Sequence, residues 1–467
     1  MNSQPPQQQP PHAPTHLTPD PAVPHEVSPP AGEPSKRKGK RTRLGGLTLD
    51  LTPLKVSRDF RLLLIGQSAS FFGSMMSFVV LPWQMYRLTR SSLAVGLLGV
   101  AEFVPVLLMA LVGGALADYV DRRRMVRLTE LLLTLGSGVL ILNSLLPQPK
   151  VWLLFVCAAS FAALNGLQRP SLEALIPRLV QPELLPAASA LNALCRNIGY
   201  VAGPALGGLL AATVGPALAY SLDLLTFVIS LIALWMMRAV PPPPDAERPS
   251  IRSILEGLRY AKSRQELMGT YLVDINAMFF GMPMALFPAV AETFGGASVG
   301  LLYSAPAVGS LLATLTSAWT ARVHRHGLAV VVAAALWGLA IIGFGFAGRL
   351  WLALLCLACA GAADMVSGLF RMTIWNQTIP DHLRGRLAGI EMVSYTTGPL
   401  LGNAESGLIA SLFSLRTSIV SGGILCVLGT GLLAMALPAF LHYDGREGLA
   451  RKREEEASRL TASRQTV

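Results

Sequence analysis

Apolar residues along this chain gather into long runs that short polar segments separate. A run of about 20 apolar residues forms an α-helix long enough to cross a bilayer, and we find twelve such runs. They occupy residues 60–87, 92–117, 125–147, 150–173, 187–213, 216–238, 267–291, 297–321, 328–347, 350–375, 386–412 and 416–441. Only Lys150 and Arg349 divide two of the closely spaced pairs. The pattern predicts an all-α membrane protein with twelve transmembrane helices.

Three short segments recur in the same order in the second part of the chain. Val-Gly-Leu-Leu at 95–98 returns 204 residues later, and Gly-Pro-x-Leu-Gly at 203–207 returns 195 residues later. A weaker Trp-Leu echo links 152–153 to the segment 199 residues further on. Membrane transporters built from repeated halves hold their substrate site between the halves. We therefore predict two pseudo-symmetric six-helix halves around a central cavity that opens alternately to each side.

The polar segments divide the chain into five parts. The eleven prolines among the first 34 residues favour disorder, and Pro241 to Pro244 stop the sixth helix. After them, residues 251–264 have the pattern of an amphipathic helix lying on the inner membrane surface. The parts are a Pro-rich and basic tail (1–57), the first half (58–238), a linker (239–266), the second half (267–442) and a charged tail (443–467).

Charge is scarce and unevenly placed. Charged residues make up 14% of the chain, against about a quarter in soluble proteins. The net charge of +11 could suit nucleic acid, yet about 30 of the 38 Lys and Arg residues fall in segments on one side of the predicted helices. This positive-inside distribution places both termini in the cytoplasm. We expect a multi-pass protein of the cytoplasmic membrane that contacts lipid, through the basic run 36–43 among others, and no nucleic acid.

The loop after the second run carries a recognisable signature. It resembles the loop between helices 2 and 3 of the major facilitator superfamily (MFS), although Tyr119 stands where a basic residue is usual and Asp121 where glycine is usual. Aspartate tolerates left-handed backbone better than most residues, so the sequence is compatible with a tight turn there. The matching residues are Gly114, Asp118, Arg122 and Arg123.

This resemblance implies that the loop latches the two halves in the outward-facing state. Asp118 would take that role, and we expect Glu391, at the start of the eleventh helix, to lie close to it in the closed latch. The alternative is that Arg122 to Arg124 only anchor the topology. The second half has Arg322 in place of the acid, which makes a one-sided latch.

The fifth run holds glycines four residues apart, a spacing that puts them on one helix face and allows another helix to approach closely. It resembles the helix-5 motif of MFS exporters, Gly-x-x-x-Gly-Pro-x-x-Gly-Gly, which is associated with efflux. The alternative is generic packing of small residues. The matching residues are Gly199, Gly203, Pro204, Gly207 and Gly208.

Over residues 50–442 the chain is most similar to the enterobactin-exporter branch of the MFS. The similarity rests on the segments 111–118 and 241–244, on Phe-Pro-Ala-Val-Ala at 287–291, and on Gln-Thr-Ile-Pro at 377–380 with the Gly-Arg that follows. Macrolide and multidrug exporters are close to this branch. The resemblance implies the MFS fold, a monomer, and a siderophore or drug-like substrate.

Charged residues inside a bilayer are costly, so each is a candidate site. In MFS folds helices 1, 4, 7 and 10 line the cavity, and this places two groups of candidates. The proton-coupling candidates are Asp274 and Asp364. The substrate-binding candidates are Gln67, Asn165, Arg169, Asn276 and Arg371. Asp364 and Arg371 are two helical turns apart and share a face. Glu173 and Asp223 are interpreted as solvated residues near helix ends.

Other function classes lack their signatures. There is no nucleotide-binding Gly-x-x-x-x-Gly-Lys-Ser/Thr segment, and all seven histidines lie in tails or loops, so we expect neither a metal site nor catalytic residues. Cys356 and Cys359 have the Cys-x-x-Cys spacing of redox motifs, but in an apolar helix we interpret them as small packing residues. We predict a non-enzymatic, cofactor-free efflux transporter that exchanges protons for a small organic molecule, driven by the proton gradient. An uptake permease on the same fold is the alternative, and a membrane-embedded enzyme or sensor is a third hypothesis.

Overall fold

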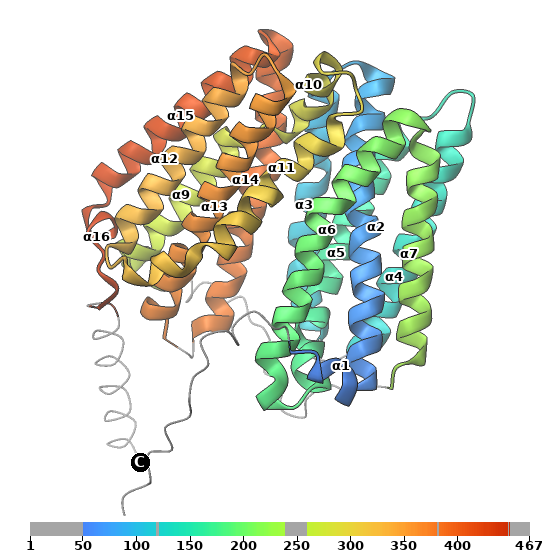
Figure 1. Ribbon diagram of the computed structural model, residues 1–467, viewed down its shortest axis with the longest axis horizontal. Helices are drawn as coiled ribbons and strands as arrows, with labels where there is room; N and C mark the ends of the chain where they lie inside the picture. Colours follow the sequence, from blue (N-terminus) through green and yellow to red (C-terminus); the bar gives the residue numbers. More distant parts are fainter. Residues whose placement is uncertain (1–49, 118–120, 239–258, 381–382, 447, 449–467) are drawn as a thin grey trace, which may run out of the picture. The chain divides into compact units, whose positions relative to one another are not determined.

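The computed structural model describes residues 50–117, 121–238, 259–380, 383–446 and 448, and the fold is helical (Figure 1). The first half opens with a short helix and continues with six long ones, which begin and end close to the predicted runs. They are α1 (Thr52–Val56), α2 (Arg58–Thr89), α3 (Ser92–Ala117), α4 (Arg122–Leu145), α5 (Val151–Leu179), α6 (Leu185–Thr213) and α7 (Pro216–Met236). A 3₁₀ turn, η2 (Pro182–Leu184), precedes α6.

The second half repeats this order with more interruptions. Its elements are α9 (Gln265–Gly281), η3 (Met284–Leu286), α10 (Phe287–Thr293), α11 (Val299–Leu315), η4 (Ser317–Arg322), α12 (His326–Gly345), α13 (Leu350–Thr378), α14 (Arg384–Leu412), α15 (Leu415–Ala436) and α16 (Pro438–Leu441). Lys150 and Arg349 are the residues that precede α5 and α13. Both predicted divisions between closely spaced runs are therefore confirmed.

The seventh run was expected as one helix, and the structure breaks it. Met282 leaves the helical region with φ −122° and ψ 77°, and Pro283 follows. Proline disfavours helical backbone at the residue before it, so α9 ends at Gly281 and the chain restarts through η3 into α10. The extent of the run was predicted correctly, but its continuity was wrong.

Among the described residues, nine helical segments are long and apolar enough to cross a membrane, and Val299–Leu315 is a shorter apolar helix. Helices α6 and α14 are not among the nine. Both match predicted runs, but small and polar residues such as glycine, alanine, asparagine and serine make up much of their sequence. The Pro-rich tail, most of the 239–266 linker and nearly all of the charged tail lie outside the described residues.

The two halves have the same pattern of helix packing. In the first half α2 packs against α6 and α7, α3 against α5, and α4 against α5 and α7. In the second half α9 packs against α14 and α15, α11 against α13, and α12 against α13 and α15. Counting long helices from the start of each half, these are the same pairs. The internal repeat seen in the sequence is therefore a structural repeat.

The halves meet through two symmetry-related helix pairs, α3 with α14 and α6 with α11. A Cβ on Gly96 or Gly99 would overlap the backbone of Asn403 or Leu400, because α3 and α14 are so close. In the other pair, the Ser304 hydroxyl donates to the Val201 carbonyl at 2.7 Å. Buried apolar residues from both halves join in one hydrophobic core, which includes Met76, Val95, Leu98, Val299 and Leu302.

Candidate functional site

A cluster of charged side chains lies within the apolar helices of the second half. Arg371 of α13 forms an ion pair with Asp274 of α9, and its Nη2 lies 3.5 Å from Oδ1 of Asp364. The side chains of Asp274 and Arg371 are 5% and 11% exposed, whereas that of Asp364 is 39% exposed. Ser394 of α14 donates a 3.3 Å hydrogen bond to the other carboxylate oxygen of Asp274. Three helices thus hold one arginine between a buried and a half-exposed acid.

The arginine is not fully satisfied in this arrangement. Its buried Nε has no hydrogen-bond partner among the described residues. Glu391 of α14 lies within electrostatic reach of Arg371 and of Arg169. Because one cation faces several acids, protonation or removal of one acid leaves the arginine free to interact with another anion.

Arg169 connects the first half to α14. Its guanidinium lies over the ring of Tyr395, 5.2 Å from the ring centroid, and its Nε donates to Glu173 at 2.9 Å. Cation–π contacts of this kind contribute about 0.5–1 kcal/mol at exposed sites. The Glu173 side chain is 65% exposed, as predicted for a solvated residue near a helix end. Arg169, unlike the buried Arg371, keeps much of its surface accessible, with 45% of its side chain exposed.

A second group of cationic and aromatic residues lies on α2 and α6. Arg196 stands over the ring of Phe71, 5.0 Å from the centroid, and its Nη2 donates to Tyr200 at 3.3 Å. The Phe71 and Tyr200 rings meet edge to face at 4.9 Å. None of these three residues is among the site residues predicted from the sequence; the four-residue spacing of Arg196 and Tyr200 on one helix was the available signal.

Three of the predicted substrate-binding residues make contacts inside their own half. Asn276 of α9 donates to the Cys426 carbonyl at 2.9 Å and to Thr430 Oγ1 at 3.2 Å, both on α15. Asn165 donates to the Phe161 carbonyl one turn earlier on α5, at 2.9 Å, and is exposed. Asn276 therefore joins two helices, whereas the side chain of Asn165 stays accessible.

Gln67, the third, belongs to a buried polar network. Its Nε2 donates to Glu130 of α4 at 2.8 Å and to Ser230 of α7 at 3.1 Å. Glu130 is fully buried and also accepts from Ser70 of α2, at 3.1 Å, and from Gln168 of α5, at 3.1 Å. The network joins four helices of the first half around one carboxyl group.

Asp223 of α7 was expected to be solvated, and this expectation is wrong. The residue is 0% exposed and accepts hydrogen bonds from Ser77 at 2.5 Å and Ser137 at 3.0 Å, both to Oδ2. Its Oδ1 has no hydrogen-bond partner among the described residues. Asp223 was expected to be exposed because it lies near the start of an apolar run. In the structure, α2 and α4 pack over this part of α7 and bury its side chain.

The glycines of the fifth run pack against α2 and α11. A Cβ on Gly203 would lie 2.6 Å from Cβ of Met75, and one on Gly207 would lie 2.7 Å from Cα of Met76. A Cβ on Gly208 would overlap the backbone of Gly300 on α11, and one on Gly199 would lie 2.6 Å from the ring of Phe71. The spacing thus brings one helix into close contact both with its own half and with the other half. Pro204 lies inside α6.

The predicted latch is described only in part. Asp118 lies outside the described residues, and Gly114 lies in α3. Arg122 is buried and donates to the Ala174 carbonyl at 3.3 Å. Arg123 donates to two carbonyls at the end of α7, those of Leu234 and Trp235, both at 2.7 Å. Cations at a helix C-terminus stabilise its unpaired carbonyls and its dipole, so Arg123 binds α4 to α7.

Asp121 acts differently from the glycine it replaces. Its φ is −52°, outside the left-handed region, and its side chain accepts from the Arg123 amide at 2.9 Å. Aspartate is a favoured N-cap because its carboxylate satisfies free amides of the first helical turn. Asp121 therefore begins α4, and its backbone does not need the left-handed turn expected from the sequence.

The described residues hold no group of three or more His, Cys, Asp or Glu side chains that could bind a metal ion. The five cysteines carry free thiols in the structure. Within the described part of the chain, the structure brings three of the predicted site residues, Asp274, Asp364 and Arg371, into one cluster.

Comparisons with known proteins identify relatives of this chain. A family described as transmembrane secretion effector matches residues 48–457. The enterobactin exporter EntS of Escherichia coli (strain K12) is 31% identical over 402 residues, covering 85% of this chain and 95% of that protein. The enterobactin exporter EntS of Citrobacter koseri is 32% identical over 396 residues, covering 83% and 94% of the two chains.

Solved structures of other transporters share the fold. A POT family transporter in complex with 5-aminolevulinic acid superposes with a TM-score of 0.66 at 12% identity, covering 82% of this chain and 97% of that one. A bacterial homologue of the human lysosomal transporter Spinster, in an inward-facing and unoccupied conformation, gives a TM-score of 0.64 at 15% identity, with 84% and 97% covered. At these identities the likeness extends to the fold alone.

Proposed function

This chain belongs to the transmembrane secretion effector family of the major facilitator superfamily, and on that basis we propose that it exports a small organic molecule across the cytoplasmic membrane. Export proceeds by alternating access of the central cavity, and inward proton flow drives it. Both termini lie in the cytoplasm, and the transporter acts as a monomer. The observation that carries the proton-coupled part is the ion cluster of Arg371 with Asp274 and Asp364, buried among apolar helices.

The cluster supports a simple exchange. With both acids ionised, Arg371 is held by carboxylates on α9 and α13. The ionised carboxylate of Asp364, the more exposed acid, also accepts hydrogen bonds from hydroxyl groups of a substrate that enters from the cytoplasm. A proton that reaches Asp364 from outside removes this charge and releases the substrate outward, and loss of the proton to the cytoplasm restores the carboxylate. Proton and substrate thus compete for the same carboxylate, which is the requirement for antiport.

The distribution of cations and aromatic rings favours a substrate that is anionic and aromatic. Arg169 over Tyr395, and Arg196 over Phe71 and Tyr200, place guanidinium groups beside ring faces. Relatives at 31–32% identity are named enterobactin exporters. We therefore place a siderophore of the catecholate class first, and a drug-like compound second.

The packing between the halves supports alternating access. Helices α3 with α14, and α6 with α11, contact each other near the turns α2–α3 and α6–α7. With cytoplasmic termini these turns face outward, so the contacts close the outer end. Transport then requires these contacts to open, while Asp118 and Glu391 approach each other at the inner end.

Cells that lack the gene and complemented cells provide the test. Export of a catecholate siderophore, a macrolide and a cationic dye is measured in both, with and without an uncoupler. We expect uncoupler-sensitive export of the siderophore in complemented cells, and its loss when Asp274→Asn and Asp364→Asn are combined. Unchanged export in the double variant would overturn the proposed coupling site. Faster accumulation in complemented cells would instead show an uptake permease.

A further inference from the structure

Two carboxyl groups lie inside the packing of the first half and take no part in the exchange at Asp364. Glu130 of α4 and Asp223 of α7 are each 0% exposed. Among the described residues, neither has a cation as a hydrogen-bond or ion-pair partner. A carboxylate that is removed from water without a cation is costly, so such a group takes up a proton instead. Both acids are therefore candidates for proton binding away from the Arg371 cluster.

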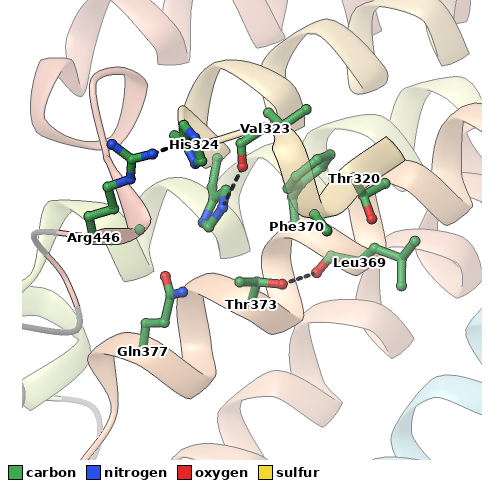
Figure 2. A pocket seen from close by; sticks show the side chains of 11 residues that line it. Thr320, Val323, His324, Leu369, Phe370, Thr373, Gln377 and Arg446 are labelled. Carbon is green, nitrogen blue, oxygen red and sulfur yellow. Dashed lines mark hydrogen bonds between the residues drawn. The ribbon is translucent and has the colours of Figure 1, made fainter. Parts of the chain in front are cut away.

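The fold does not require acids at these positions. Helices α12 and α15 are the second-half equivalents of α4 and α7, they pack in the same pattern, and neither has an acidic residue. Buried Ala334, Trp337 and Cys426 lie on them instead. A cavity of about 580 Å³ elsewhere in the second half has threonine, histidine, glutamine and arginine in its polar lining, but no acid (Figure 2). The two acids without a cation thus belong to the first half and are not needed for the repeated packing.

The partners of Glu130 suit the carboxyl group in both of its protonation states. Its Oε1 accepts from Nε2 of Gln67 at 2.8 Å and from Nε2 of Gln168 at 3.1 Å, and the Ser70 hydroxyl lies 3.2 Å from Oε2. When Glu130 is ionised, all three side chains donate to it. When it is neutral, the amides still donate to Oε1, and the O–H at Oε2 donates to Ser70, because a hydroxyl both donates and accepts. A proton can therefore bind and leave without repacking of the helices.

Asp223 has fewer partners and serves as a comparison. Two serine hydroxyls donate to its Oδ2, and its Oδ1 has no hydrogen-bond partner among the described residues. No amide group donates to it. An ionised Asp223 would therefore leave one charged oxygen without a hydrogen bond. We expect Asp223 to keep its proton, whereas Glu130 has the donors that a carboxylate needs.

The charged groups on the surrounding helices do not fix the protonation state of Glu130. Asp223 of α7 lies within electrostatic reach of it. Arg169 of α5 is engaged by a tyrosine ring of α14 and by a glutamate on its own helix. Arg127 of α4 lies over a tryptophan ring of α7, and α2 has charged residues only in its first and last turns. Within the described residues, no neighbouring cation holds Glu130 in its ionised form.

Two amides connect Glu130 to residues of the candidate site. Gln168 precedes Arg169, which contacts α14 of the other half. Gln67 is partly exposed and stands one turn before Phe71 on α2. A neutral acceptor holds a donor less strongly than a charged one, so a proton on Glu130 weakens both amide bonds. The protonation state of Glu130 therefore determines how firmly α2 and α5 are held beside the candidate site.

We propose that Glu130 is a further proton-binding residue of the transporter and that its charge positions Arg169 through Gln168. The inference rests on the proton-driven export proposed above. The proton reaches Glu130 beside Gln67, the partly exposed member of the network. Glu130 does not contact the substrate, so it is a positioning residue.

Infrared spectroscopy of the purified full-length protein tests the proton site. The carbonyl-stretch band of protonated carboxylic acids is recorded from acid to alkaline pH. We expect one component of this band to disappear as the pH rises, to be missing in Glu130→Gln at every pH, and to remain in the matched control Asp223→Asn. A Glu130 component that stays constant at every pH would show a permanently neutral residue and overturn the proposal. A titrating component that Glu130→Gln retains would overturn it as well.

Gln168→Leu tests the link to Arg169 and leaves the acid in place. The substitution removes an amide donor that stabilises the ionised form more than the neutral one, so the proton affinity of Glu130 should rise about fivefold or more. The Glu130 component should then persist to more alkaline pH, and the KM for export should rise because Arg169 is less firmly positioned. An unchanged titration and an unchanged KM would refute the role of Gln168.

The same spectra separate this inference from the proposed function. They report proton binding in the absence of any substrate. A titrating Glu130 in a protein that exports none of the three test compounds would support the proton site and overturn the proposed export. Export with a pH dependence that is the same in Glu130→Gln and in the native protein would overturn the coupling role of Glu130 and leave the proposed export intact.

Discussion

Gly208 of α6 packs against the backbone of Gly300 of α11, so that a Cβ on Gly208 would overlap the other helix. Gly300 belongs to the recurring Val-Gly-Leu-Leu segment, and Gly208 directly follows the recurring Gly-Pro-x-Leu-Gly segment. The same crossing occurs on the symmetric side, where Gly96 lies against the backbone of Asn403. Each Val-Gly-Leu-Leu segment therefore packs against the Gly-Pro-x-Leu-Gly helix of the opposite half. The recurrence of these motifs is explained by their shared position, because both copies form the contact between the halves.

Gly300→Val should block this contact. Inserting methyl groups into close-packed helices costs about 1–3 kcal/mol, which changes an equilibrium between two conformations by about 5- to 150-fold. The substitution destabilises only the conformation in which α6 and α11 are in contact. We therefore expect normal amounts of the variant protein in the membrane and an export rate reduced by about tenfold. Export rates and membrane levels measured in the same cells check this.

Gly431→Val is the matched control, since a Cβ on Gly431 of α15 would meet no atom within 4 Å. It should retain export. If Gly300→Val exports as well as Gly431→Val, the contact between the halves does not limit transport.

The sequence allowed the fold to be predicted because spans and repeats leave strong local signals. Runs of apolar residues fix helix positions, and small residues at four-residue spacing indicate where helices touch. The break at Met282 was missed because hydropathy averages over a window and does not register the backbone effect of Pro283. The role of Asp121 was missed because a cap depends on which residue begins the helix.

The candidate site was only partly predictable. Asp274, Asp364 and Arg371 were chosen as charges in cavity-lining helices, and the structure brings them together. Gln67 and Asn276 were chosen on the same ground, but their side chains bond within their own halves. A single sequence shows to which helix a residue belongs. The direction in which its side chain points depends on how that helix is rotated about its axis, and this is determined by the packing of all its neighbours. A helix face that contacts lipid is as apolar as one that packs against another helix, so there is no single hydrophobic stripe from which the rotation could be inferred.

Arg371→Gln should destabilise the protein more than Asp274→Asn. Removing the arginine leaves Asp274 buried without a cation, and breaking a buried pair in this way costs about 3–5 kcal/mol. After Asp274→Asn, the arginine still has Asp364 at 3.5 Å, so a smaller cost is expected. Thermal unfolding of the purified variants in detergent measures the difference.

Combining the two substitutions separates stability from function. The double variant leaves only the half-exposed Asp364 without its cation. It should therefore recover much of the lost stability, yet it should not export, because Arg371 is gone from the cluster. A double variant less stable than Arg371→Gln alone would contradict the ion-pair interpretation.

Glu292→Gln should have little effect on stability. Glu292 of α10 accepts from Arg90 at the end of α2, at 2.5 Å, and the two side chains are 28% and 58% exposed. Exposed ion pairs contribute about 0–1 kcal/mol because water and salt screen them. The expected loss is below about 1 kcal/mol, and it should shrink further in high salt. A loss comparable to that of Arg371→Gln would mean that this pair is a main contact between the halves.

Asp223→Asn should be tolerated, whereas Asp223→Leu should not. The side chain of Asp223 is completely buried, and among its hydrogen-bond and ion-pair partners in the described residues there is no cation. Its contribution therefore comes from accepting two hydroxyl hydrogens at Oδ2, which an amide oxygen also does. Leucine would leave Ser77 and Ser137 without that acceptor, at about 1–3 kcal/mol in total if the hydroxyls partly rebond to their own helices. Thermal unfolding should show the asparagine variant close to the native protein and the leucine variant well below it. Equal damage from both substitutions would instead mean that the charge of Asp223 is needed, and would make it a second candidate for proton coupling beside Asp364.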